Sequence, residues 1–256
     1  MIDQPHSSWA EVYDIAYQRS FGDFYARLTD ATVDLIAKRV QLPAKIVDFG
    51  AGTGRLSIPL SRKGFDVTAV EPCENMLNQL KRKDVAGLVT VACSKMENFR
   101  GEVHFDAALC VFTVILYLLE ETALRRSFEA ANASLKPGGI LILDIPSEAI
   151  FSGYSRRDAI FERCVTVTHN SESIYTYREE LVVKNDDGEP TRYEDEFRIR
   201  HWHSEQVIRV LQDTGFSLLE DLSALFFGTG SNYYILKKAE QGAAPDGNSA
   251  ALHCRR

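Results

Sequence analysis

The stretch VDFGAGTG, residues 47–54, lies between a short apolar run and the start of a helical pattern. The run KIVDF, residues 45–49, is too short for a helix and is bounded by Pro43 and Gly50, so we interpret it as a buried strand. A strand, a glycine-rich turn and a helix form a nucleotide pocket, because glycine permits close backbone approach and a helix N-terminus offers free N–H groups. The stretch therefore predicts a ligand at this turn.

The loop departs from the dinucleotide fingerprint G-x-G-x-x-G. Its third glycine would fall at position 55, where the chain has Arg55, and the acid Asp48 would be poorly placed beside a pyrophosphate. A dehydrogenase stays open as an alternative, and Arg55 weakens it. The acid suits a ligand with a cationic end.

Residues 48–54 resemble motif I of the class I S-adenosylmethionine-dependent methyltransferases, roughly [DE]-x-G-x-G-x-G. S-adenosylmethionine carries an ammonium and a sulfonium and no phosphate, which fits an acid before the turn. The resemblance implies that this cofactor is bound by Asp48, Gly50, Ala51 and Gly52, while Gly54 serves helix packing.

The second strand ends in an acid, Glu71, 19 residues after Gly52. A carboxylate there can accept both ribose hydroxyls. A dehydrogenase would also use such an acid, so Glu71 alone does not discriminate. The run EPCENML (71–77) resembles the family pattern E-P-S-x-x-M-L, which adds Pro72 and places Met76 against the adenine; ordinary helix packing is the alternative for Met76.

Three more motifs follow in order, and the terminal GF…NYYILKK stretch resembles the family's antiparallel seventh strand, so the resemblance covers residues 9–238. CSKMENF (93–99) corresponds to the stretch in which the family has an Asp that contacts the adenine amine. Here Lys95 or Cys93 replaces that Asp, so the resemblance leaves backbone contacts to the adenine near Met96 and Glu97. FDAALCVFTVILYL (105–118) resembles the fourth-strand motif and adds Cys110 and Val111 to the cofactor set. LKPGGILILDIP (135–146) resembles the fifth strand and its preceding turn. For the side chains of Cys73, Cys93 and Cys110 we favour a role as small buried filler.

Strand and helix patterns alternate along the chain. Apolar runs predict strands at 45–49, 65–71, 87–93, 105–114 and 138–146; helical spacing predicts helices at 8–41 with a break near Gly22, 54–63, 73–83, 120–135 and 204–216, the last with Ser204 as N-cap and Gly215 at its end. Residues 218–238 predict two strands around GTGSN. The pattern indicates an α/β fold with a parallel sheet covered on both faces. The resemblance implies a doubly wound, seven-stranded Rossmann-like sheet with a terminal antiparallel hairpin.

An antiparallel β excursion follows the fifth strand. CVTVTHN, SIYTYREELVVKN and TRYEDEFRIRHWH alternate polar and apolar residues, and NDDGEP (185–190) predicts a turn. We divide the chain into an N-terminal helical lid (1–42), a cofactor-binding core (43–146), a β insertion that forms a substrate roof or a dimer surface (147–203), the remainder of the core sheet (204–238) and a disordered tail (239–256).

Five side chains are candidates for the substrate side of the site. The resemblance implies that Tyr13 and Tyr17 lie on a segment that closes over cofactor and substrate; core packing is the alternative. Tyr117, His201 and His203 are candidate bases for an amine or hydroxyl acceptor. The two histidines share a face at i, i+2, but no third ligand with recognisable spacing appears, so we predict no metal.

Composition narrows the function class. The chain has 256 residues, a net charge of −7 and no Lys/Arg block, which disfavours nucleic acid. Five scattered cysteines and an N-terminus unlike a signal peptide favour a soluble, cytoplasmic protein without membrane contact. We predict N- or O-methylation of a small molecule by in-line displacement, with a homodimer as one assembly. An RNA (tRNA) methyltransferase and a non-catalytic S-adenosylmethionine-binding regulatory protein are the alternatives.

Overall fold

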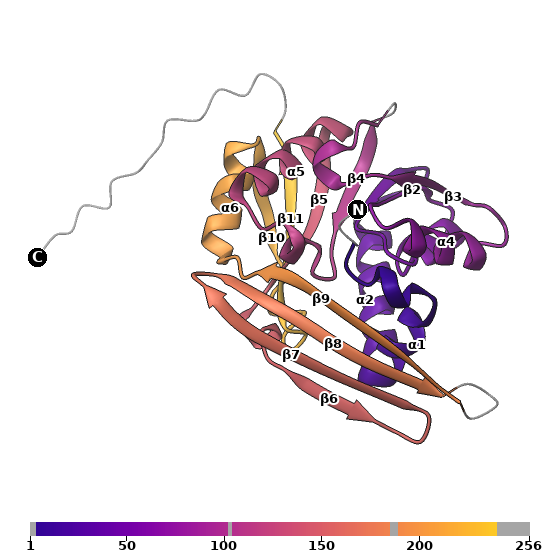
Figure 1. Ribbon diagram of the computed structural model, residues 1–256. Coiled ribbons are helices and arrows are strands. Elements are labelled where there is room, and N and C mark those ends of the chain that lie inside the picture. Colours follow the sequence, from indigo (N-terminus) through magenta and orange to yellow (C-terminus); the bar gives the residue numbers. More distant parts are fainter. Residues whose placement is uncertain (1–3, 102–103, 185–188, 240–256) are drawn as a thin grey trace, which may run out of the picture.

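The structure, a computed structural model, describes residues 4–101, 104–184 and 189–239 (Figure 1). Its core is a seven-stranded sheet in the order β10-β11-β5-β4-β1-β2-β3. Its strands are β1 (Lys45–Phe49), β2 (Asp66–Glu71), β3 (Val89–Cys93), β4 (Phe105–Cys110), β5 (Leu135–Pro146), β10 (Phe216–Asp221) and β11 (Ser231–Lys238). The first five strands are parallel, while β11 pairs antiparallel with both β5 and β10. This confirms the predicted fold class.

Helices cover both faces of the core sheet. They are α3 (Ser57–Arg62), α4 (Glu74–Lys83), α5 (Glu121–Ser134) and α6 (Ser204–Asp213). Alternate side chains of β1 enter two separate buried clusters: Ile46 packs with residues of α3 and α4, and Val47 packs with residues of α5 and α6. The near-continuous apolar strands are therefore explained by burial on both faces.

The N-terminal part is helical, as the spacing predicts. It contains η1 (Ser7–Val12), α1 (Tyr13–Phe21) and α2 (Asp23–Arg39), where η marks a 3₁₀ helix. Gly22 separates α1 from α2 with a φ of 55°, a conformation that favours glycine. Buried residues of α2, such as Val33 and Ile36, join the cluster on one face of the core sheet. Residues 4–22, which we call the N-terminal segment, instead face a second sheet.

That second sheet, which we call the roof, has four antiparallel strands in the order β6-β7-β8-β9. They are β6 (Tyr154–Arg157), β7 (Phe161–Ser171), β8 (Ile174–Lys184) and β9 (Pro190–Arg200), preceded by η4 (Glu148–Ile150). Figure 1 shows the roof running past α1 below the core sheet. The sequence missed β6, a short and largely exposed edge strand without alternation. Residues 185–188 of the predicted turn and residues 240–256 of the predicted tail lie outside the described residues.

Several predicted boundaries are wrong, and Cys93, predicted as buried filler, is exposed. The first of the two strands predicted around GTGSN, β10, already ends at Asp221. The strand predicted over 105–114 ends at Cys110, because Phe112 and Thr113 take positive φ angles of 65° and 70°. The helix predicted from 54 begins at Ser57. Ser204 is the first helical residue of α6 and not its N-cap; His203 holds that position without a side-chain capping bond. No helix in the described ranges is both long and apolar enough to cross a bilayer.

Candidate functional site

The glycine-rich turn leaves the carboxyl end of β1 and is held against β2. The backbone N–H groups of Gly50 and Ala51 both donate to the carbonyl of Val70, at 2.8 and 3.2 Å. Gly50 and Gly52 have φ angles of 69° and 55°. A Cβ on Gly50 would lie 2.5 Å from a methyl carbon of Val114, so the turn requires glycine there for space as well as for conformation.

Glu71 connects the end of β2 to this turn. Its Oε2 accepts the N–H of Gly52 at 3.0 Å, and its Oε1 accepts the N–H of Cys73 at 2.9 Å. Burial raises the pKa of Glu71, while these two backbone donors oppose the shift. Each carboxylate oxygen keeps a lone pair, so Glu71 can still accept bonds from a ligand.

Asp48 is a second buried acid at the same rim. Its Oδ2 accepts the hydroxyl of Ser57 at 2.6 Å. Burial raises its pKa to about 7, with a smaller contribution from the charge of Glu71. In the described part of the chain neither Asp48 nor Glu71 forms an ion pair with Lys or Arg. Two buried, unpaired carboxylates at one rim fit a ligand that carries positive charge.

The remaining predicted cofactor residues surround the same rim. Met76 and Cys73 are buried in a small cluster with Ala10 and Tyr13 of the N-terminal segment. Ala51 is buried and Pro72 is half-buried. The side chains of Cys110, Val111 and Met96 enter the core clusters, so only their main chain is free to meet a ligand; Glu97, beside Met96 in η2 (Met96–Asn98), is half-buried.

The loop after β4 is strained and tightly held, a feature that the sequence did not reveal. The carboxylate of Asp144 on β5 accepts the N–H of Thr113 at 3.0 Å. The guanidinium of Arg55 lies 3.6 Å from the ring centre of Phe112 and 3.8 Å from that of Tyr25. Arg55, which displaces the third glycine of the dinucleotide pattern, thus fixes the loop that leads into η3 (Val114–Tyr117).

Tyr13, Tyr17 and Tyr117 come together with a histidine that the sequence analysis did not single out. Tyr13 stacks between Trp9 and Tyr17, with ring centres 5.2 and 4.5 Å apart. The hydroxyl of Tyr117 lies 2.9 Å from Nε2 of His6. These aromatic side chains lie where the N-terminal segment meets the roof.

The roof contributes three charged groups that sequence reasoning also missed. Glu179 is fully buried, and Arg163 donates to its Oε2 at 2.7 and 3.1 Å. The other oxygen, Oε1, lies 3.0 Å from Nδ1 of His6, and Asp195 accepts the N–H of His6 at 2.5 Å. The partners are separated by more than 170 residues, so spacing gave no signal. The alternation of β8, which places Glu179 on the same face as buried Leu181, could have revealed an inward-facing acid.

His201 and His203 lie close to each other, with ring centres 4.9 Å apart. The ring of His201 contacts Phe151, and His203 is exposed. Within the described residues no hydrogen bond or ring contact connects either histidine to Tyr117. Their predicted catalytic role therefore stays a prediction, without support from the contacts around them.

Comparisons with known proteins agree with this geometry. A methyltransferase domain model matches residues 46–139. A protein of Geobacillus sp. (strain WCH70) that is named as a methyltransferase is 29% identical to this chain over 224 residues. The match covers 78% of this chain and 89% of that protein. The dTDP-3-amino-3,4,6-trideoxy-α-D-glucopyranose N,N-dimethyltransferase of Streptomyces venezuelae is 25% identical over 64% of this chain and 69% of its own. A solved S-adenosylmethionine-dependent methyltransferase of Clostridium acetobutylicum shares the fold, with a TM-score of 0.79, 19% identity and coverage of 90% and 99%.

Proposed function

We propose that this chain, which belongs to the class I S-adenosylmethionine-dependent methyltransferases, methylates an amine of a small, polar molecule. The family, the methyl-transfer activity and the use of S-adenosylmethionine follow from the domain match, the relatives and the fold. The acceptor and the roles of single residues are our proposal.

The rim described above would hold S-adenosylmethionine. We assign its cationic end to the surroundings of Asp48, Gly50, Ala51 and Gly52, and its ribose to Glu71. Pro72, Met76, Met96 and Glu97 would border the adenine, with main-chain contacts from Cys110 and Val111. The bound cofactor supplies a methyl group on a sulfonium that leaves as a neutral thioether, so the protein must mainly align the acceptor and exclude water.

One observation carries the small-molecule assignment: the rim is covered from two sides. Ala10 and Tyr13 of the N-terminal segment pack on Met76, and Trp9 of the same segment forms a buried cluster with Phe161 and Leu181 of the roof. An acceptor must fit beneath these elements, which supports a small molecule and a lid role for Tyr13 and Tyr17.

The charge of this region favours an amine. Asp48, Glu71 and Glu179 are buried acids, and only Glu179 is paired with an arginine. The buried indole N–H of Trp9 has no hydrogen-bond partner in the described part of the chain. It could therefore donate a hydrogen bond to an oxygen of the molecule that is methylated. An amino sugar combines an ammonium with hydroxyl oxygens, and one relative is named for N-methylation of such a sugar.

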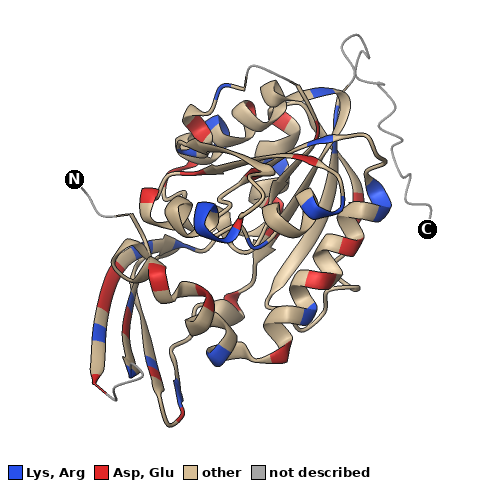
Figure 2. Cartoon of the chain, turned by 90° about the vertical axis from the view of Figure 1, so that its right-hand side faces the viewer, with Lys and Arg blue, Asp and Glu red and all other residues tan. Residues whose placement is uncertain are grey.

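The RNA alternative finds little support. Figure 2 shows Lys and Arg interspersed with Asp and Glu along the helices and the roof strands. A nucleic-acid surface gathers basic side chains on one face. A non-catalytic regulatory protein would bind the same cofactor, so only a measurement of methyl transfer distinguishes it from our proposal.

Turnover is tested with methyl-labelled S-adenosylmethionine and a panel of free and dTDP-linked amino sugars, with the corresponding hydroxyl sugars as controls. We expect label on the amino sugars only. Label on hydroxyl sugars would overturn the amine assignment. Binding of the cofactor without transfer to any acceptor, tRNA included, would favour the regulatory protein.

We also propose a homodimer, with its contact away from the roof. The outward face of the roof carries exposed ion pairs, such as Arg178 with Glu180. Leu225 and Phe227 are 71% and 92% exposed, beside a hollow of about 500 Å³ along α2. Light scattering should give a dimer for the native chain and a monomer for Phe227→Glu; a monomeric native chain at high concentration would contradict the proposal.

A further inference from the structure

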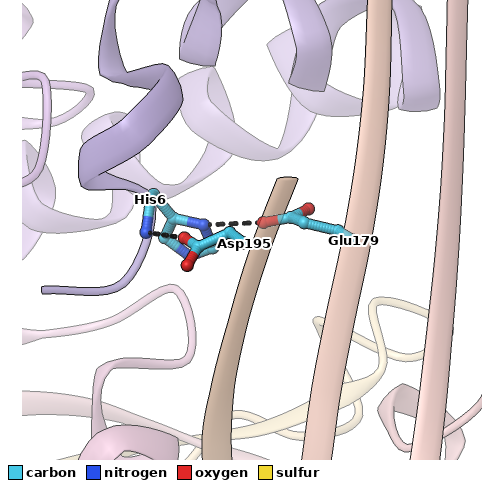
Figure 3. A group of neighbouring side chains, drawn as sticks. All are labelled: His6, Glu179 and Asp195. Atoms are coloured by element: carbon cyan, nitrogen blue, oxygen red, sulfur yellow. Dashed lines mark hydrogen bonds and ion pairs between the residues drawn. The ribbon is translucent and has the colours of Figure 1, made fainter. Parts of the chain in front are cut away.

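His6 connects three parts of the molecule at once. It precedes η1 in a left-handed conformation with a φ of 65°. Its Nδ1 lies 3.0 Å from Glu179 of β8, and its backbone N–H donates to Asp195 of β9 at 2.5 Å (Figure 3). Its Nε2 lies 2.9 Å from the hydroxyl of Tyr117 in η3. The histidine is 6% exposed. Both ring nitrogens are therefore committed to named partners inside the protein.

A metal ion is the first alternative for this group. Ligand atoms of His6, Glu179 and Asp195 all lie within 4.8 Å of one another. However, Arg163 already donates twice to Glu179, and its guanidinium would repel a cation placed beside that carboxylate. The second ring nitrogen of His6 faces Tyr117, and Asp195 is occupied by a backbone donor. The group is better suited to carry a proton than a metal.

The contacts define where that proton resides. Burial raises the pKa of Glu179, but the hydrogen bond from His6 and the guanidinium of Arg163 outweigh it and hold the pKa below its ordinary value. Glu179 is thus an anion and can only accept, so Nδ1 of His6 must carry a hydrogen. In neutral histidine Nε2 is then bare, and it accepts the O–H of Tyr117. Burial raises the pKa of Tyr117 far above its ordinary value, which keeps that O–H intact.

We propose that His6, oriented by Glu179, accepts a proton from the substrate amine, which arrives as an ammonium ion. The proton passes to His6 through Tyr117. This inference rests on the proposed amine methylation. Tyr117 would be the catalytic residue that touches the amine, and His6 and Glu179 would act through it as positioning residues. The arrangement follows the logic of an acid that fixes the tautomer of a histidine and stabilises its protonated form.

The methyl transfer follows a proton relay through Tyr117. The ammonium N–H proton passes to the Tyr117 oxygen while the Tyr117 O–H proton passes to Nε2 of His6, which leaves a neutral amine, a neutral tyrosine and an imidazolium paired with Glu179. The freed nitrogen lone pair then forms the bond to the methyl carbon as the carbon–sulfur pair goes to sulfur. The product leaves as an N-methylammonium, and His6 later releases its proton to water.

The surroundings support an imidazolium during this step. Charged and titratable groups that face His6 come from every element packed on it: Glu179 and Asp195 of the roof, Tyr117 of η3 and Tyr13 of α1. Arg163 lies behind Glu179, and Glu71 is close enough for its pKa to respond to His6. Because His6 belongs to the N-terminal segment, the proton acceptor is assembled only when that segment is seated.

The first test reads the histidine directly and needs no acceptor. The chain is labelled with ¹⁵N-histidine and saturated with S-adenosylhomocysteine at pH 8, and the His6 signals are identified by their loss in His6→Gln. We expect the Nδ1–H tautomer with a bare Nε2, a shift of the Nε2 signal in Tyr117→Phe and loss of the tautomer preference in Glu179→Gln. An Nε2–H tautomer, or a ring protonated on both nitrogens up to pH 9, would overturn the proposal.

The second test follows kcat against pH with the amine identified by the labelling panel. His6→Gln keeps a polar atom near Tyr117 but cannot take up a proton. We expect kcat to fall about 10²-fold at pH 7 and to recover as the amine deprotonates above pH 9, with the affinity for S-adenosylhomocysteine unchanged. His169→Gln, an exposed residue of β7, is the matched control. A native pH profile in His6→Gln would contradict the relay, whereas failure of the native chain to methylate any amine would contradict the proposed function and leave the tautomer result standing.

Discussion

The Oε2 atom of Glu71 accepts the backbone N–H of Gly52 at 3.0 Å. The bond joins the acid at the end of β2 to the glycine-rich turn that follows β1, so two sequence motifs form one rigid unit. Because Glu71 and the turn are already held in place before a ligand arrives, this site loses little conformational freedom on binding. This unit is the part of the rim to which we assign S-adenosylmethionine.

The turn should tolerate a methyl group at Gly52 better than at Gly50. Gly50→Ala places a Cβ 2.5 Å from Val114, which we expect to cost about 1–3 kcal/mol of stability in addition to ~1 kcal/mol for the positive φ. A Cβ on Gly52 finds its nearest neighbour, in Met76, at 3.6 Å, so Gly52→Ala should carry only the second cost. Urea unfolding measures both variants.

The double variant Gly50→Ala/Val114→Ala is the control for that explanation. Removal of the valine methyl groups should restore most of the loss caused by the clash, although Val114→Ala alone should be mildly destabilising. Equal losses in Gly50→Ala and Gly52→Ala would mean that backbone conformation, and not space, decides the requirement.

Asp48 should reduce the stability of the free protein. Its folded pKa of about 7 exceeds its ordinary value of 3.8, so the folded chain holds this proton more tightly and the free energy of unfolding falls as pH rises from about 4 to 7. The difference corresponds to ~4 kcal/mol at pH 8. Asp48→Asn should therefore be more stable than the native chain at pH 8, with a smaller difference at pH 5, and should bind S-adenosylmethionine more weakly. Lower stability of the variant at pH 8 would contradict this.

Most of the core fold could be predicted from the sequence because its signals are local. Continuous apolar runs between turns indicated β1, β2 and β4, and helical spacing with Gly22 as a breaker indicated α1 and α2. The end of β4 could not be predicted, because Phe112 and Thr113 are ordinary strand formers. The two residues take positive φ angles, and the N–H of Thr113 bonds to Asp144, 31 residues away.

The residues of the candidate site also fall into those with a local sequence signal and those without one. Asp48, Gly50 and Glu71 could be predicted as cofactor residues because a motif fixes their spacing. His6, Arg163 and Glu179 were missed because their contacts span the roof, and no spacing rule relates a residue before η1 to a strand more than 170 residues later. Local patterns therefore predict the residues that we assign to the cofactor, while those that we assign to the methyl acceptor required the tertiary structure.

The pair Arg163–Glu179 should be essential for stability. Both side chains are fully buried, with N and O 2.7 Å apart, so Arg163→Met leaves a buried carboxylate with His6 alone and should cost about 3–5 kcal/mol. Arg157 and Glu162, exposed on the same sheet at 3.6 Å, form the matched control, and Arg157→Ala should cost less than ~1 kcal/mol. Similar values for the two variants in urea unfolding would refute the assignment of Arg163–Glu179 as a buried pair.

Asp144 should keep the loop after β4 in place. In Asp144→Ala the N–H of Thr113 loses its acceptor, which we expect to cost about 1–3 kcal/mol and to accelerate hydrogen exchange at the Thr113 amide at least tenfold. Asp144→Asn retains an acceptor oxygen and should exchange at close to the native rate. Unchanged exchange in the alanine variant would show that packing, for example of Arg55 on Phe112, is sufficient to hold the loop.

Calorimetric titration of the native chain, Asp48→Ala and Glu71→Ala with S-adenosylmethionine, S-adenosylhomocysteine and NAD tests this cofactor assignment most directly. We predict micromolar binding of both adenosyl ligands to the native chain, loss of that binding in both variants and no binding of NAD. Binding of NAD alone, or native affinity for S-adenosylhomocysteine in both variants, would contradict the assignment of residues 48–54 and Glu71 as the cofactor site.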